Sequence, residues 1–127
     1  MQDFTATLQG LRVLVVEDEV LVALLVESML SDMGCRVVGP AGGLDEAFAI
    51  AAREPFDLAV LDVNLAGERV DPFVDLLKSR GSKFLFATGY GVAGLREEDR
   101  CAPVLQKPFD QLRLGQALAG LAAPGHA

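Results

Sequence analysis

Histidine and cysteine are scarce in this chain, which has one His and two Cys among its 127 residues. Cys35 and Cys101 lack the clustered spacing of a zinc site, and we expect both to be reduced. Long apolar runs are also missing, since none approaches the roughly 18 residues that a membrane-spanning helix needs. The first ten residues lack the basic flank and apolar stretch of a secretion signal. These absences favour a cytoplasmic protein without a membrane partner.

Positive charge is also in short supply. Eighteen Asp and Glu residues outnumber eleven Lys and Arg residues, which gives a formal net charge of -7. Because phosphate backbones are bound by basic surfaces, this balance argues against nucleic acid as a partner. Hydrophobic residues make up 51% and charged residues 23%, which is typical of a globular chain, and the length suits one domain.

Short apolar runs alternate along the chain with segments of helical spacing. Residues 89–100 have three glycines among their first six positions, so we expect a short, loose helix there at best. Such alternation indicates a parallel sheet with helices on both of its faces. We therefore predict an α/β fold, a doubly wound five-stranded parallel sheet with five helices of the flavodoxin-like (βα)5 type. The predicted strands are 11–16, 36–38, 57–62, 83–87 and 103–106.

Local signals predict where several of these elements begin and end. The second strand is expected to stop before Gly39, and residues 63–70 are expected to form a loop. Asp71 is predicted to be a helix N-cap, because Pro72 suits the first helical position. Asp110 is predicted to cap the last helix.

Polar side chains stand at the ends of four predicted strands. Glu17 and Asp18 follow the first, Asp62 ends the third, Thr88 closes the fourth and Lys107 follows the fifth. These ends lie at one edge of a parallel sheet, where open α/β folds bind ligands. Like charges about 4 Å apart repel by roughly 4 kcal/mol at an effective dielectric of about 20, so converging carboxylates need a cation. Any one acid alone reads more simply as a solvent-facing helix cap; the five positions together indicate a site.

Two cations fit among these acids. One is the ammonium of Lys107, and the other is Mg²⁺, which prefers hard oxygen ligands and keeps waters that a phosphate can displace. A carboxylate beside Mg²⁺, with a hydroxyl and an ammonium nearby, suits in-line attack by Asp62 on a phosphoryl group to form an aspartyl phosphate. Lys107 and Thr88 would then each bind a phosphoryl oxygen.

Five motifs in this order carry a resemblance to a known family. They are Val-Glu-Asp-Glu at 16–19, Leu-Asp-Val-Asn-Leu at 61–65, Gly67, Thr88 and Lys107-Pro108-Phe109. This set resembles the receiver domain of two-component response regulators. The resemblance covers nearly the whole chain and implies a receiver domain at 11–122, a lead-in at 1–10 and a tail at 123–127.

The resemblance implies a phosphorylation-dependent signalling switch. Asp62 would accept a phosphoryl group from a histidine kinase or a small phosphodonor. Asp18 would bind Mg²⁺ directly, Glu17 largely through water, and Asn64 through its backbone carbonyl. The chain would then not be a conventional enzyme, although self-phosphorylation and slow autodephosphorylation are expected.

The resemblance also implies how the signal leaves the site. Thr88 would be the switch hydroxyl and Lys107 the phosphate-pairing lysine, with a cis peptide bond before Pro108. Receivers usually have an aromatic switch residue where this chain has Val104. Instead, Phe-Ala-Thr-Gly-Tyr at 86–90 resembles a subset of often stand-alone receivers linked to bacterial stress signalling. We expect Tyr90 to take over the output role.

Other functions remain open from the sequence. A phosphatase of the haloacid dehalogenase type also forms an aspartyl phosphate, but it needs a second aspartate where this chain has Asn64. A pseudo-receiver that never accepts phosphate and a phosphate sink or phosphorelay intermediate are further alternatives. A downstream protein is expected to bind the face formed by the fourth strand, fourth helix, fifth strand and fifth helix. The chain is expected to be a monomer or weak homodimer, either full-length or a fragment of a longer regulator.

Overall fold

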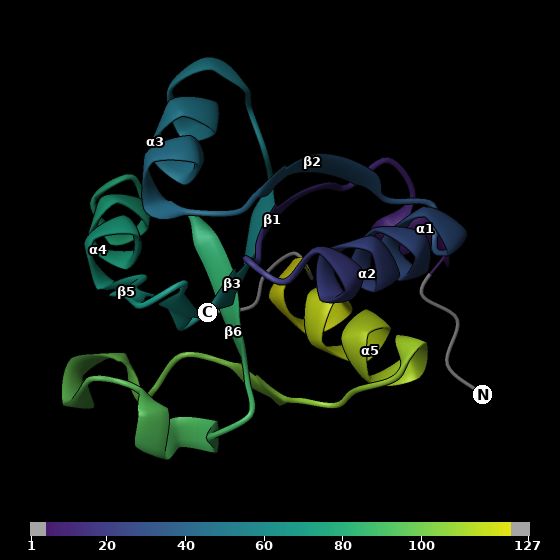
Figure 1. Cartoon of the computed structure of the whole chain (residues 1–127). Helices are drawn as coiled ribbons and strands as arrows, with labels where there is room; N and C mark the ends of the chain where they lie inside the picture. Colours follow the sequence, from purple (N-terminus) through teal and green to yellow (C-terminus); the bar gives the residue numbers. More distant parts are fainter. Residues whose placement is uncertain (1–4, 123–127) are drawn as a thin grey trace.

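Five parallel strands form the centre of the molecule (Figure 1). In this computed structural model, which describes residues 5–122, the strand order is β2-β1-β3-β6-β7. The strands are β1 (Arg12–Val16), β2 (Arg36–Ala41), β3 (Leu58–Asp62), β6 (Lys83–Thr88) and β7 (Val104–Gln106). The predicted fold class and the alternation of strands with helices are confirmed.

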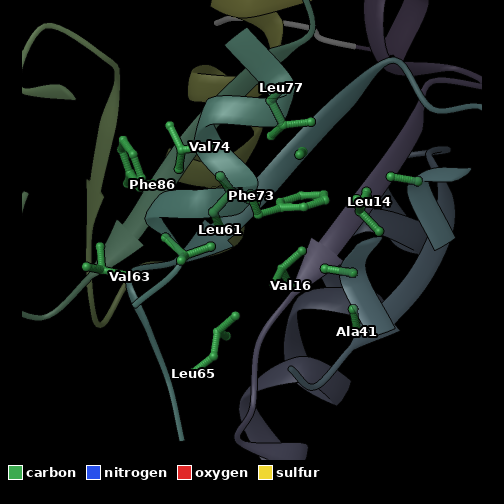
Figure 2. Close-up of a cluster of buried hydrophobic side chains, with 14 of the residues drawn as sticks. Leu14, Val16, Ala41, Leu61, Val63, Leu65, Phe73, Val74, Leu77 and Phe86 are labelled. Atoms are coloured by element: carbon green, nitrogen blue, oxygen red, sulfur yellow. The ribbon is translucent and has the colours of Figure 1, made fainter. Parts of the chain in front are cut away.

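Helices cover both faces of the sheet (Figure 1). The helices are α1 (Thr5–Leu8), α2 (Val20–Asp32), α3 (Leu44–Arg53), α4 (Asp71–Ser79) and α5 (Gln111–Ala122). Because side chains alternate along a strand, β1 serves two cores: Val13 and Val15 pack with α1, α2 and α5, whereas Leu14 and Val16 pack with α3 and α4. Figure 2 shows the second of these cores, in which the fully buried Phe73 of α4 points toward the sheet.

Strand register brings the predicted polar ends together. Val16 of β1 pairs with Leu61 of β3, so Asp62 follows at the same level as the start of the β1–α2 loop. Asp62 in turn pairs with Ala87 of β6, and Thr88 pairs with Gln106 of β7. The carboxyl ends of four strands therefore meet at one edge of the sheet.

Strand β2 is longer than the sequence predicted. It continues past Gly39 to Ala41, through a cis peptide bond between Gly39 and Pro40 and a register shift against β1. The backbone N–H of Glu17 donates a hydrogen bond to the carbonyl of Ala41 at 2.9 Å, which extends the pairing to the start of the site. The prediction of a strand ending before Gly39 was therefore wrong, because a long-range contact prolongs it.

The predicted loop at 63–70 contains a two-stranded antiparallel hairpin, β4 (Asn64–Leu65) and β5 (Glu68–Arg69). Ala66 and Gly67 connect the strands with positive φ values of 52° and 91°, as in a two-residue hairpin turn. The N-cap of α4 is Val70, so the prediction of Asp71 as N-cap was wrong by one residue.

Residues 89–102 contain no α-helix and confirm the expectation from their glycines. They form two short 3-10 helices, η1 (Gly91–Gly94) and η2 (Glu97–Asp99). The predicted cap of α5 is confirmed, because Asp110 Oδ1 accepts a hydrogen bond from the N–H of Arg113 at 2.9 Å.

The described part of the predicted lead-in, residues 5–10, contributes to the core. Leu8, at the end of α1, is fully buried and belongs to the core beneath α2 and α5. The predicted tail at 123–127 lies outside the described residues. Between residues 5 and 122, no helix is long and apolar enough to cross a membrane. Cys35 and Cys101 are both free thiols, as expected.

Candidate functional site: an acidic pocket at the edge of the sheet

Three carboxylates meet where β1 and β3 end. One oxygen from each of Glu17, Asp18 and Asp62 lies within 4.8 Å of the others. The adjacency of β1 and β3, which the sequence left undetermined, produces this arrangement. Glu17 is buried, and Asp18 and Asp62 are partly buried. The acids therefore repel one another in a poorly hydrated place.

Lys107, directly after β7, supplies a positive charge to this group. Its Nζ lies 2.7 Å from Glu17 Oε1 and 3.5 Å from Asp62 Oδ2. The Lys107–Pro108 peptide bond is cis, as expected. Burial opposes the charged ammonium, but the hydrogen bond to Glu17 and the charge of Asp62 outweigh it and raise the pKa of Lys107 above its ordinary value. Lys107 is therefore a firmly held cation.

One ammonium does not neutralise three acids. Burial, and then the charge of Glu17, raise the pKa of Asp62 to about 6, although Lys107 acts in the opposite direction. A carboxylate held in this way gains from any further cation that approaches it. A metal ion bound beside Asp62 would therefore favour its charged form.

The hairpin after Asp62 forms the opposite wall of the site. The N–H of Ala66 donates to Asp18 Oδ2 at 2.9 Å, and the N–H of Gly67 donates to Asn64 Oδ1 at 3.0 Å. A non-glycine residue with positive φ is uncommon, and the contact with Asp18 helps to hold Ala66 in this conformation. Asp18, which follows β1, is thereby tied to the hairpin that follows β3.

Thr88 and Tyr90 occupy different environments despite their spacing. Thr88 is buried, and its hydroxyl oxygen accepts a hydrogen bond from the N–H of Tyr90 at 3.1 Å. The Tyr90 side chain is 81% exposed. Val104, at the position where receivers usually have an aromatic residue, is partly buried and packs against the core beneath α3 and α4.

An open cavity of about 340 Å³ joins these groups. Its walls include the predicted residues Asp18, Asp62, Asn64, Thr88, Tyr90 and Lys107. Pro108 lies outside it and lines a neighbouring recess. The cavity also has a wall residue that sequence reasoning missed, Arg69 of β5. Nothing in the sequence marks Arg69 clearly as part of the site. The sequence shows only a basic residue in a predicted loop, because the hairpin that carries Arg69 was not predicted.

Known proteins share both the sequence pattern and this fold. A family model for the response regulator receiver domain matches residues 13–119. The chain belongs to this family. Receiver domains of response regulators act in two-component signalling as switches rather than as conventional enzymes, and they generally use Mg²⁺ at an acidic pocket.

Several relatives give this assignment more detail. The transcriptional regulatory protein PdtaR of Mycobacterium tuberculosis is 31% identical over 102 residues, covering 77% of this chain and 50% of PdtaR. The BeF3-activated conformation of SdrG from Pseudomonas melonis Fr1 is 35% identical with a TM-score of 0.75, covering 94% of this chain and 97% of SdrG. The response regulator PhyR from Brucella abortus is 26% identical with a TM-score of 0.78, covering 91% of this chain and 50% of PhyR. The chain thus spans about half the length of the curated relatives it matches.

Proposed function

We propose that this receiver domain is a phosphorylation-dependent switch in which Asp62 is the phosphoacceptor. An Asp62 carboxylate oxygen attacks phosphorus in line, a bond forms between them, and the donor's bond to phosphorus breaks with its electron pair leaving on the donor. Lys107 then pairs with one phosphoryl oxygen and Thr88 donates its hydroxyl hydrogen to another.

The observation that carries this proposal is the placement of Asp62. Its Oδ2 lies 3.5 Å from Lys107 Nζ, it lines one cavity with Thr88, and burial and the charge of Glu17 raise its pKa. The relative SdrG has a BeF3-activated conformation, which supports activation at an equivalent site in this chain.

The donor set suits Mg²⁺. All three candidate ligands are carboxylates, the hard oxygen donors that Mg²⁺ prefers, and one oxygen from each lies within 4.8 Å of the others. We propose that Asp18 and Asp62 hold the ion directly, Glu17 through water and Asn64 through its backbone carbonyl. When bound, Mg²⁺ would offset negative charge on the phosphoryl oxygens.

Incubation with acetyl phosphate and Mg²⁺, followed by intact-mass measurement, tests the proposal. The wild-type protein should gain one phosphoryl group, and D62N should gain none. D75N is the matched control, because Asp75 of α4 is an exposed carboxylate paired with Arg96. It should gain the group like the wild type.

Two alternatives give different results in the same assay. No increment in the wild-type protein would point to a pseudo-receiver. Steady turnover of a phosphate ester would point to an enzyme, although Asn64 lacks the acid and base function that a dehalogenase-type phosphatase needs at that position. If the wild type is phosphorylated but phosphorylation does not change partner binding, the protein is a phosphate sink or a phosphorelay intermediate.

We propose that a histidine kinase docks beside the acidic pocket, on an apolar face of α2 and the start of α5. Leu21, Leu24 and Leu25 of α2 and Leu112 of α5 are between 54% and 81% exposed. Leu25 also lines an apolar recess that contains Lys107 and Pro108. Because Lys107 lines both this recess and the acidic pocket, a protein bound here can present a phosphoryl group to Asp62.

The proposed output lies on a face formed by β6, residues 89–100, β7 and α5, which shares α5 with the proposed kinase face. Tyr90 supports it, since its exposed ring follows the buried Thr88 by two residues. We propose a cytoplasmic receiver domain at 11–122 that binds a downstream protein in stress signalling, a role suggested by the likeness to the PhyR stress response regulator. A Y90A variant whose phosphorylation-dependent partner binding matches the wild type would end the output role of Tyr90.

A further inference from the structure

Three side-chain contacts hold the glycine-rich segment 89–94 at the mouth of the pocket. Gln106 Nε2 donates to the carbonyl of Gly89 at 2.8 Å, and Thr88 Oγ1 accepts from the N–H of Tyr90 at 3.1 Å. At the other end, Arg69 Nη2 donates to the carbonyl of Gly94 at 3.1 Å. The Arg69 contact differs from the others because it crosses from the hairpin wall of the cavity.

Gly94 lies directly against the proposed switch residues. A Cβ placed on Gly94 would lie 3.3 Å from Tyr90 Cβ and 3.8 Å from Thr88 Oγ1. The bond from Arg69 therefore fixes the backbone that packs on the Thr88 hydroxyl and the base of the Tyr90 side chain. A movement of Gly94 would change the surroundings of both residues at once.

A carboxylate orients the Arg69 side chain. Its Nε lies 2.7 Å from Asp71 Oδ2, at the start of α4, while its side chain remains 49% exposed and lines the same cavity as Asp62. A guanidinium has five N–H donors, and a phosphoryl group offers it a charged acceptor where Gly94 offers a neutral one. A phosphoryl group in this cavity would thus compete with the neutral carbonyl of Gly94 for Arg69.

We infer that Arg69 is a positioning residue that couples the pocket to segment 89–94. In the unphosphorylated protein it holds the segment closed through Gly94. When Asp62 carries a phosphoryl group, Arg69 turns to that anion and releases Gly94, and the segment with Tyr90 opens. This inference rests on the proposed phosphorylation of Asp62, but the contact between Arg69 and Gly94 can be tested without phosphate.

Hydrogen–deuterium exchange of peptides covering residues 89–95 tests the inference, with wild type, R69M and R69K each measured without and with BeF3 and Mg²⁺. Without BeF3, R69M should exchange about tenfold faster than wild type, the factor expected for loss of one charged hydrogen bond. R69K, which keeps a donor but not the fork, should lie between them. BeF3 should speed exchange in wild type and change R69M by less than about twofold.

R80M is the matched control. Arg80 Nη1 also donates to a backbone carbonyl at 3.1 Å, that of Ala51, at the other end of α4. R80M should exchange like wild type at residues 89–95. Three results would each overturn the role of Arg69. In the first, R69M without BeF3 exchanges at the wild-type rate. In the others, R80M speeds exchange as much as R69M does, or BeF3 leaves exchange in the wild type unchanged. Failure of the proposed function would instead appear as no phosphoryl increment in wild type with acetyl phosphate.

Discussion

At the scale of single residues, Asp62 is a carboxylate whose burial and neighbours both oppose its charge. Glu17 lies at the same edge of the sheet, and the Lys107 ammonium contacts both acids. The pKa of Asp62 is raised to about 6 as a result. The charge that makes this residue suitable for a metal and a phosphoryl group therefore costs stability when neither is bound.

This cost predicts that D62N stabilises the metal-free protein at pH 7.5. The raised pKa corresponds to at most about 3 kcal/mol of unfavourable ionisation energy in the folded state. Because a raised carboxyl pKa destabilises the fold only where the group is ionised, the advantage of D62N should shrink as the pH falls through about 6. Urea unfolding in EDTA at pH 7.5 and pH 5 measures the difference.

The opposite sign is expected for D57N. A hydrogen bond from Arg12 holds the pKa of Asp57 below its usual range, so D57N should lose stability at pH 7.5.

Added Mg²⁺ should stabilise the wild type by mass action and D62N much less. Equal stability of D62N and wild type at both pH values would contradict the charge argument.

At the scale of elements, the sequence pattern predicts those features that depend on residues close together in the chain. Helix α3 has the apolar spacing of a helix, and the cap of α5 depends on one side chain, that of Asp110. Long-range contacts decide the rest. The last residues of β2 depend on the bond from Glu17 to Ala41, and the hairpin turn depends in part on the contact of Ala66 with Asp18.

The same distinction applies to the site. The carboxyl ends of parallel strands lie at one edge of the sheet whatever the loops do, so the acids, Thr88 and Lys107 could be assigned to that edge from the sequence, whereas the adjacency of β1 and β3 could not. Arg69 could not, because its place in the cavity depends on the hairpin and on the carbonyl of Gly94. The glycines of residues 89–94 predicted that the segment 89–102 would form only weak helix. They did not predict the charged contacts that hold its 3-10 turns.

Those contacts anchor η2 to α4. Asp99 is 1% exposed, and its carboxylate contacts Lys78 Nζ of α4 and, at 2.8 Å, Arg96 Nε. Burial would raise the pKa of Asp99, but the hydrogen bonds from Arg96 and Lys78 outweigh it and hold the pKa below its usual value. The anchored part of the segment, 95–102, thus follows the glycine-rich part that is proposed to move.

We expect D99N to lower the free energy of unfolding by about 2 kcal/mol at pH 7, the range for a hydrogen bond to a charged group. A lowered carboxyl pKa adds stability above its unfolded value of 3.8, so the loss should stay constant down to about pH 4 and disappear below it. Urea titrations over this range measure it. E98Q is the control, since Glu98 is exposed and lies 3.6 Å from Arg96, and it should change stability by less than about 1 kcal/mol. A D99N loss that grows on acidification would refute the assignment.

At the scale of the whole molecule, two exposed surfaces border one pocket from different sides. The apolar recess beside α2 contains Lys107 and Pro108, and residues of segment 89–94 line the acidic pocket together with Thr88. The proposed kinase surface thus borders the pocket on one side, while the proposed output surface starts on the other. Damage to the first surface should then affect the supply of phosphate and leave the chemistry of the pocket intact.

The double variant L21Q/L25Q tests this separation. Both side chains are more than half exposed, so the fold should tolerate the change, whereas loss of two apolar contacts at a docking surface should slow phosphotransfer by about tenfold or more. The measurement is the initial rate of phosphotransfer from a purified histidine kinase, chosen from a panel as the fastest donor to wild type. Phosphorylation by acetyl phosphate should keep its wild-type rate, because a small donor does not touch α2. V92Q, on the proposed output side and 50% exposed in the wild type, should keep both rates. If L21Q/L25Q retains the full kinase rate, or loses the acetyl phosphate rate as well, the two surfaces are not separate and α2 is not where the kinase binds.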